Sequence, residues 1–237
     1  MSKTGKLYLI PTIIAENTQE KVVPLQVLEV LKAIRHFVVE DVRTARRYLS
    51  SLKIFESIES LQFQVLNKDT KTSELNDILK PIWEGYDVGI ISESGCPGVA
   101  DPGALAVSFA HQHNIQIVPL VGPSSILLAL MASGLNGQHF AFHGYLPIDA
   151  KEAAKTIKEL EHESKIKNQT QIFIETPYRN NSILEHLMKN LRSDTLLSIA
   201  VDITGPMETI KTKTIKQWKQ EIPALGKQPA VFSFLAV

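Results

Sequence analysis

The segment from Ile90 to Gly103 constrains the fold of this chain more than any other. Apolar residues lead up to Ser92, after which three glycines and two prolines occur within nine positions. Glycine weakens regular structure and proline lacks an amide donor, so neither a strand nor a helix can continue here. The residues Ala104–Asn114 then have helical character. The segment predicts a buried strand, a loop rich in special backbone positions, and a helix, in that order.

The same alternation of short apolar strands and helices runs through the first half of the chain. Strands are predicted at 6–12, 36–41, 61–66, 87–92 and 115–121, and helices at 24–34, 42–52, 70–85 and 104–114, with a bend at Pro81. Such alternation indicates an α/β fold with a mostly parallel sheet covered on both faces.

The second half has a different order. Helices are predicted at 125–135, 151–167 and 180–191, and strands at 139–147, 169–175, 196–204 and 229–237. We expect a domain boundary near residues 118–123, because helix, strand and charged helix follow one another differently beyond it.

Charge and cysteine content exclude several classes of site. Lysine plus arginine equals aspartate plus glutamate, at 25 each, so nucleic-acid binding would need a local basic patch. Cys96 is the single cysteine, which excludes an internal disulfide, and no paired Cys/His spacing predicts a metal site. Since no apolar run approaches ~18 residues and no signal peptide is recognisable, we expect a cytoplasmic protein without a membrane segment.

Three turns rich in glycine or proline follow predicted strands: "PTIIAEN", "SESGCPG" and "VGPSS". Ligands of open α/β sheets bind beyond the carboxyl ends of the strands, and Gly95 and Gly98 would allow a close backbone approach. The alternative is a connection whose glycines serve backbone geometry alone. Asp101, Ser124 and Ser125 precede helices, where capping explains them, although the same groups could hold a polar ligand.

Arg43, Arg46 and Arg47 fall at helical spacing on one face, after Asp41 as a helix cap. Three arginines could contact nucleic-acid phosphates. The alternative is a solvated face paired with Glu40 or other acids.

Cys96 has no histidine within sequence reach that would activate it as a nucleophile. G-x-G-x-x-G, P-loop, H-E-x-x-H and G-x-S-x-G motifs are absent, so a nucleotide-like ligand would be held in another way.

"SESGCPGVADPG" resembles the S-D-A-G-T-P-x-x-x-D-P-G signature of the ribosomal RNA small-subunit methyltransferase I family, in the tetrapyrrole methylase superfamily. "GKLYLIPTII", "LEVLKAIRHFVVEDVRTARRYL", "VPLVGPSSILLALMASGL", "FAFHGYLP" and "QIFIETPYRNNSILEHL" are similar to further motifs of that family, in the same order.

This resemblance implies two α/β domains, 1–120 with a mostly parallel sheet and 121–237 with a mixed sheet, and S-adenosylmethionine in the cleft between them. It also implies a homodimer that methylates a ribose 2′-hydroxyl of small-subunit ribosomal RNA, free or in the subunit. By position, the resemblance assigns cofactor contacts to Pro11, Ser92, Glu93, Ser94, Gly95, Pro97, Ser124, Ser125, Ile203 and Ala230. It assigns the RNA side to Glu40, Asp41, Arg43, Arg46 and Arg47.

The chain departs from the family pattern at a few positions. Ala15 replaces a glycine, Glu93 an aspartate and Gly205 a lysine, and of an H-x-H-N motif only Asn67 remains. Most of these positions lie on the expected substrate side. We therefore expect a retained methyltransferase whose RNA target has drifted.

A ribose hydroxyl is a poor nucleophile and would benefit from a base, for which Glu40 is our candidate. The alternative for Glu40 is an ion pair with Arg43 or Arg47. Two other functions remain open: methylation of a tetrapyrrole or another small acceptor, and a non-catalytic protein that binds the cofactor or RNA.

Overall fold

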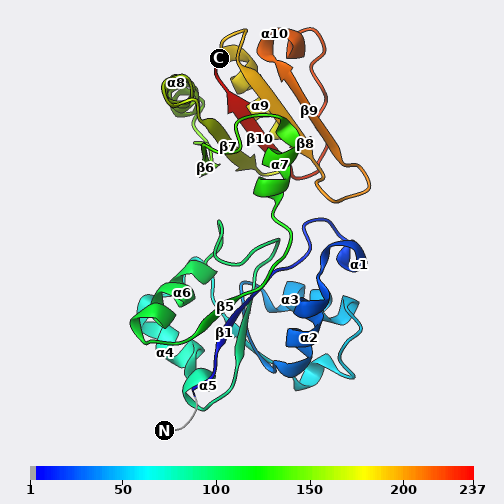
Figure 1. Cartoon of the computed structure of the whole chain (residues 1–237), viewed down its shortest axis with the longest axis vertical. Helices are drawn as coiled ribbons and strands as arrows, with labels where there is room; N and C mark the ends of the chain where they lie inside the picture. Colours follow the sequence, from blue (N-terminus) through cyan, green and yellow to red (C-terminus); the bar gives the residue numbers. More distant parts are fainter. Residues whose placement is uncertain (1–3) are drawn as a thin grey trace. The chain divides into compact units, whose positions relative to one another are not determined.

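The computed structural model describes residues 4–237. Two compact units divide the chain, Met1–Ser124 and Ser125–Val237, and each contains a five-stranded sheet (Figure 1).

The sheet of the first unit is parallel throughout, with the strand order β3-β2-β4-β1-β5. Its strands are β1 (Leu7–Ile10), β2 (His36–Val39), β3 (Gln62–Val65), β4 (Val88–Ile91) and β5 (Ile117–Pro119). On one face pack α4 (Leu75–Ile78), α5 (Lys80–Trp83) and α6 (Gly103–Gln112), and on the other α2 (Leu25–Ala33) and α3 (Val42–Ser51) (Figure 1). The doubly covered parallel sheet expected from the alternation of elements is confirmed.

Two details of this unit differ from the prediction. The helix expected over 70–85 is three pieces, a 3₁₀ turn (Thr72–Glu74), α4 and α5. The break lies at Leu79, two residues before Pro81, whose ring and missing N–H interrupt the helical ladder. The short helix α1 (Gln19–Val22) was not predicted, because it buries no residue and so leaves no apolar stripe in the sequence.

The sheet of the second unit is mixed, with the order β6-β7-β10-β8-β9. Strand β6 (Phe140–Tyr145) is parallel to β7 (Thr170–Glu175), while β10 (Ala230–Leu235) is antiparallel to β7 and to β8 (Leu196–Val201). Helix α7 (Ser125–Ser133) covers one face, and α8 (Ala150–Lys167) and α9 (Asn180–Asn190) the other.

Strand β9 (Thr209–Thr214), antiparallel to β8, and helix α10 (Ile215–Trp218) were not predicted. The strand reads "TIKTKT" and forms an edge of the sheet. Edge strands commonly carry lysines in place of an apolar run, which removes the signal that sequence reasoning depends on.

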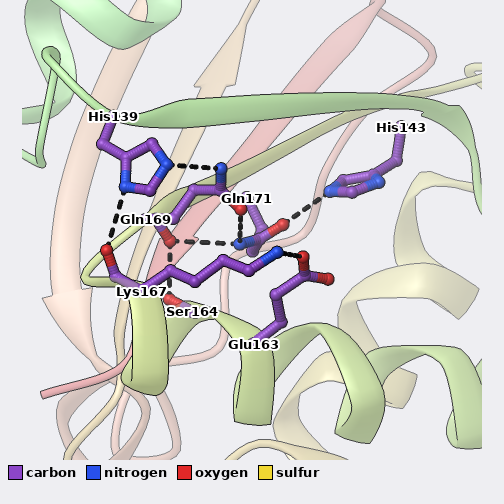
Figure 2. A network of polar contacts seen from close by, with 7 residues as sticks. All are labelled: His139, His143, Glu163, Ser164, Lys167, Gln169 and Gln171. Atoms are coloured by element: carbon purple, nitrogen blue, oxygen red, sulfur yellow. Dashed lines mark hydrogen bonds and ion pairs between the residues drawn. The ribbon is translucent and has the colours of Figure 1, made fainter.

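A chain of polar contacts fastens the other edge strand, β6, to β7 and α8 (Figure 2). His143 Nε2 donates to Gln171 Oε1 at 2.6 Å, and the Gln171 amide donates to the side-chain and backbone oxygens of Gln169. The Gln169 amide in turn donates to His139 Nε2, and His139 Nδ1 to the Lys167 carbonyl. Because carbonyls only accept and amide nitrogens only donate, the chain has one direction, and it fixes His139 as the Nδ1–H tautomer.

Replacing the fully buried Gln171 by leucine is expected to lower the free energy of unfolding by about 1–3 kcal/mol, because His143 and Gln169 each lose a partner. Urea unfolding measures this. Glu163→Gln is the control, since it weakens an exposed ion pair with Lys167 that contributes little to stability. Equal effects of the two substitutions would show that the chain of contacts does not stabilise the unit.

Candidate active site

The loop between β4 and α6 is organised by the carboxylate of Asp101. Its Oδ1 accepts hydrogen bonds from the amides of Gly98 at 2.9 Å and Gly103 at 2.7 Å. Gly95 and Gly98 have φ of +69° and +79°, which side chains rarely adopt. Helix α6 begins at Gly103, one residue before the predicted start at Ala104, and Asp101 accepts from its first amide as a capping residue does.

The loop is also fastened to the carboxyl ends of two neighbouring strands. The Thr12 amide, just beyond β1, donates to the Gly95 carbonyl at 2.8 Å, and Ser92 Oγ donates to the same oxygen. Beyond β5, the Cys96 thiol lies 3.4 Å from the Pro123 carbonyl. Burial raises the pKa of this thiol, which agrees with the expectation that it is no nucleophile.

Four consecutive amides of this loop are left without an acceptor. Within the part of the chain that the structure describes, the N–H groups of residues 93–96 donate no hydrogen bond. Glu93 and Ser94 are exposed, whereas Ser92, Gly95 and Pro97 are buried. A run of unpaired amides at a strand end can receive a carboxylate or hydroxyl oxygen, and S-adenosylmethionine carries both kinds of group. The residues present therefore fit this cofactor.

A pocket of about 420 Å³ lies beside the loop. Its lining comes from the ends of β1, β2 and β4 and from α3, which are brought together because carboxyl ends of parallel strands meet at one sheet edge. The pocket unites five of the residues assigned by the resemblance: Glu40, Asp41, Arg47, Ser92 and Glu93.

Glu40, at the end of β2, is the electrostatically perturbed group of this pocket. Burial raises the pKa of its carboxyl, and the negative charges of Glu93 and Asp101 raise it further. No ion pair joins Glu40 to Arg43 or Arg47 within the described residues. The alternative in which Glu40 is a partner of these arginines is therefore not observed.

The three arginines of α3 have different surroundings. All are exposed. Arg47 is 3.8 Å from Glu16, in a pair so exposed that it contributes little, and the Arg46 guanidinium lies over the Phe63 ring. Asp41 caps the helix as predicted, accepting from the Thr44 amide at 2.7 Å, and this hydrogen bond lowers the pKa of its carboxyl.

The remaining assigned residues are not among those that line this pocket. Pro11 directly follows β1, and its carbonyl accepts from the Tyr48 hydroxyl at 3.3 Å. Ser124 ends the first unit and Ser125 begins α7. In the second unit, Ile203 follows β8 and Ala230 begins β10, both buried at the same edge of the sheet.

Gly205, where the family pattern has lysine, lies in a tight turn close to the Asp202 side chain. A Cβ at this position would lie 2.3 Å from the Asp202 carboxylate, and the Gly205 amide donates to the Asp202 carbonyl. A lysine at this position therefore requires the Asp202 carboxylate to move.

Among the pocket residues that sequence reasoning missed are three with polar side chains, Thr12, Thr44 and Tyr48. Burial raises the pKa of the Tyr48 phenol far above its usual value, so it stays protonated and donates to Pro11. The sequence signal that could have found Tyr48 is its position four residues after Thr44 on an amphipathic helix, which places both on one face.

Residues 4–237 contain neither a metal-binding cluster nor a membrane-spanning helix. No group of three or more histidine, cysteine, aspartate or glutamate side chains could hold a metal ion. Nor is any helix there both long and apolar enough to cross a membrane.

Comparison with known proteins decides the family. Residues 22–219 match the Tetrapyrrole (Corrin/Porphyrin) Methylases. The ribosomal RNA small subunit methyltransferase I of Vibrio cholerae is 30% identical over 86% of this chain and 67% of its own length. The protein of the same name from Escherichia coli O157:H7 is 30% identical over 87% of this chain and 68% of its own length. The chain belongs to the tetrapyrrole methylase family.

Solved structures show the same fold. The methyltransferase CobJ superposes with a TM-score of 0.62 over 99% of this chain and 100% of its own, at 16% identity. Uroporphyrin-III-C-methyltransferase from Thermus thermophilus superposes with a TM-score of 0.55 over 98% of this chain and 92% of its own, also at 16% identity. The expected α/β fold is confirmed, and family membership makes the chain an S-adenosylmethionine-dependent methyltransferase.

Asp101→Ala is expected to weaken binding of S-adenosylhomocysteine about tenfold, because Gly98 and Gly103 lose the acceptor that holds the loop. Asp101→Asn keeps an oxygen at that position and should retain most of the affinity. Calorimetry measures both constants. Wild-type affinity in a folded Asp101→Ala protein would contradict the role given to this carboxylate.

Proposed function

We propose that this enzyme transfers the methyl group of S-adenosylmethionine to a ribose 2′-hydroxyl of small-subunit ribosomal RNA. The observation that carries the proposal is the pocket beside the cofactor loop, in which one carboxyl, Glu40, has a raised pKa and no ion-pair partner among the described residues. The names of the curated relatives support the choice of RNA.

When bound, S-adenosylmethionine supplies a methyl group on a positively charged sulfur, already activated for transfer. The protein's own task is to orient the hydroxyl and to receive its proton as the new carbon–oxygen bond forms. We assign proton acceptance to the Glu40 carboxylate. Its raised pKa makes it a stronger base than an ordinary glutamate.

The loop after β4 is the proposed cofactor contact of the first unit. Its unpaired amides at residues 93–96 would donate hydrogen bonds to the carboxylate or to ribose hydroxyl oxygens, and the Glu93 carboxylate would accept from a hydroxyl or the ammonium group. The further cofactor residues in the proposal are Pro11, Ser92, Ser94, Gly95, Pro97, Ser124, Ser125, Ile203 and Ala230.

The exposed arginines of α3 are the proposed contacts to RNA phosphates. Arg43, Arg46 and Arg47 form a local basic patch on a chain whose overall charge is balanced. A ribosomal substrate implies a reaction in the cytoplasm. The resemblance further implies a homodimer, which light scattering of the purified protein measures.

A small acceptor such as a tetrapyrrole is the second candidate. The pocket volume of about 420 Å³ lies within the range of small-molecule sites, which favours it. A tetrapyrrole that raises the melting temperature and accepts the methyl group would support this candidate over RNA.

Small ribosomal subunits, and RNA extracted from them, are the test substrates. From cells that lack this gene they are expected to accept radioactive methyl, retained at a ribose after nuclease digestion. The same material from cells that carry the gene should accept little, because its site is already methylated. Absence of methyl transfer to either substrate, with cofactor binding intact, would exclude the proposed acceptor. Absence of methyl transfer to the tetrapyrrole as well would favour a non-catalytic role.

Glu40→Gln is expected to lower kcat about 10²–10⁴-fold without changing cofactor affinity. Because the base must be ionised and its pKa is raised, the wild-type rate should increase with pH through that pKa. Glu40→Gln should lose this dependence. Pre-steady-state rates across pH measure the effect, and Glu16→Gln, at another pocket carboxylate, is the control.

Stability gives a further readout for the same substitution. A carboxyl whose pKa is higher in the folded than in the unfolded chain opposes folding once the pH exceeds the unfolded value. Glu40→Gln should therefore not be less stable than wild type at neutral pH. An unchanged rate with an unchanged pH profile would remove Glu40 from the mechanism.

A further inference from the structure

Two sequence motifs of the second unit have no role in the site described above. "GYLP" leads from β6 into α8, and "ETPYR" leads from β7 into α9. Strands β6 and β7 are parallel neighbours, so their carboxyl ends and both loops lie at the same edge of the sheet (Figure 1).

Arg179 ties the two loops together. Its Nη2 donates to the Pro147 carbonyl at 3.0 Å, and its Nη1 lies 3.3 Å from Glu175 Oε2. The Glu175 side chain is fully buried, and its other oxygen accepts from the Thr176 amide. An unpaired buried carboxylate would be costly, so the ion pair holds Arg179, and through it the loop at Pro147, in place.

The tie extends to a third segment. The Asn180 side-chain amide donates to the Gln228 carbonyl at 2.7 Å, just before β10. The backbone of this edge is thus held by hydrogen bonds across three segments that are distant in sequence.

On this fastened backbone, large side chains are presented to solvent. Tyr178 is 86% exposed, Ile148 is 85% exposed and Tyr145 is 57% exposed. Groups of exposed apolar side chains commonly mark binding sites, and a rigid backbone lowers the entropy that binding costs. Tyrosine provides a flat apolar face with a polar end and few rotatable bonds.

We propose that Tyr145, Ile148 and Tyr178 form a stacking platform for unpaired bases of the RNA substrate. This rests on the proposed function and names a second RNA contact in addition to the arginines of α3. Bases of single-stranded RNA stack on aromatic side chains, whereas bases in a duplex are already stacked on one another.

Charge at the same edge favours RNA over a second copy of the chain or another apolar partner. Lys151 is the second residue of α8, after the first loop, and Lys227 adjoins Gln228 in the third segment. The exposed acids Asp149 and Glu152 flank Lys151, and Asp149 is engaged as the cap of α8. Both lysines are exposed, and neither forms an ion pair within residues 4–237. Exposed ammonium groups on the segments that carry or adjoin the exposed tyrosines match a backbone of phosphates carrying unpaired bases.

Tyr178→Ala is expected to weaken binding of a fluorescent single-stranded RNA from the small-subunit sequence about tenfold, measured by anisotropy with S-adenosylhomocysteine present. Tyr178→Phe should bind like wild type, because stacking needs the ring and not the hydroxyl. Ile166→Ala, at another exposed apolar residue, on α8, is the control and should have no effect. Binding of a duplex of the same sequence should not depend on Tyr178.

Three outcomes would overturn the platform. Tyr178→Ala could bind single-stranded RNA like wild type, could lose affinity for S-adenosylhomocysteine instead, or could halve the mass of an oligomer in solution. The last two would assign the edge to the cofactor and to a second copy, respectively. If RNA binding depends on Tyr178 but no methyl reaches RNA, the platform stands and the proposed acceptor is wrong.

Discussion

The structure of the candidate site depends on the loop that follows β4, the most buried strand of the parallel sheet. Strand β4 ends in the middle of the sheet, and the loop beyond it has few regular backbone hydrogen bonds. The Asp101 carboxylate compensates by accepting from two amides of this loop, and Thr12 and Ser92 bind the Gly95 carbonyl from the other side. With the loop held at both ends, the amides of residues 93–96 stay unpaired and available to a ligand.

The same arrangement creates the electrostatics of the pocket. Parallel strands place Glu40, Glu93 and Asp101 at one sheet edge, where partial burial and then the like charges of Glu93 and Asp101 raise the pKa of Glu40. Such repulsion opposes folding at neutral pH. A cost of this kind is expected where a group is adapted to chemistry rather than to stability.

Sequence patterns predicted those parts whose cause is local. The buried strands, the breaking effect of glycine and proline, and the Asp41 cap all follow from neighbouring residues. The motifs led to the family, and the match over residues 22–219 confirms it. Strand β9 was missed because its alternating threonines and lysines lack an apolar run. The contacts of Arg179 with Pro147 and of Tyr48 with Pro11 join residues 32 and 37 positions apart, and no periodicity encodes such pairs.

A crystal structure with S-adenosylhomocysteine would test the central claim most directly, namely that the loop after β4 holds the cofactor. We expect a carboxylate or ribose oxygen of the ligand to accept hydrogen bonds from amides among residues 93–96, with Asp101 still bonded to Gly98 and Gly103. A ligand bound elsewhere, with these four amides still unpaired, would contradict the assignment of this loop and of the pocket beside it.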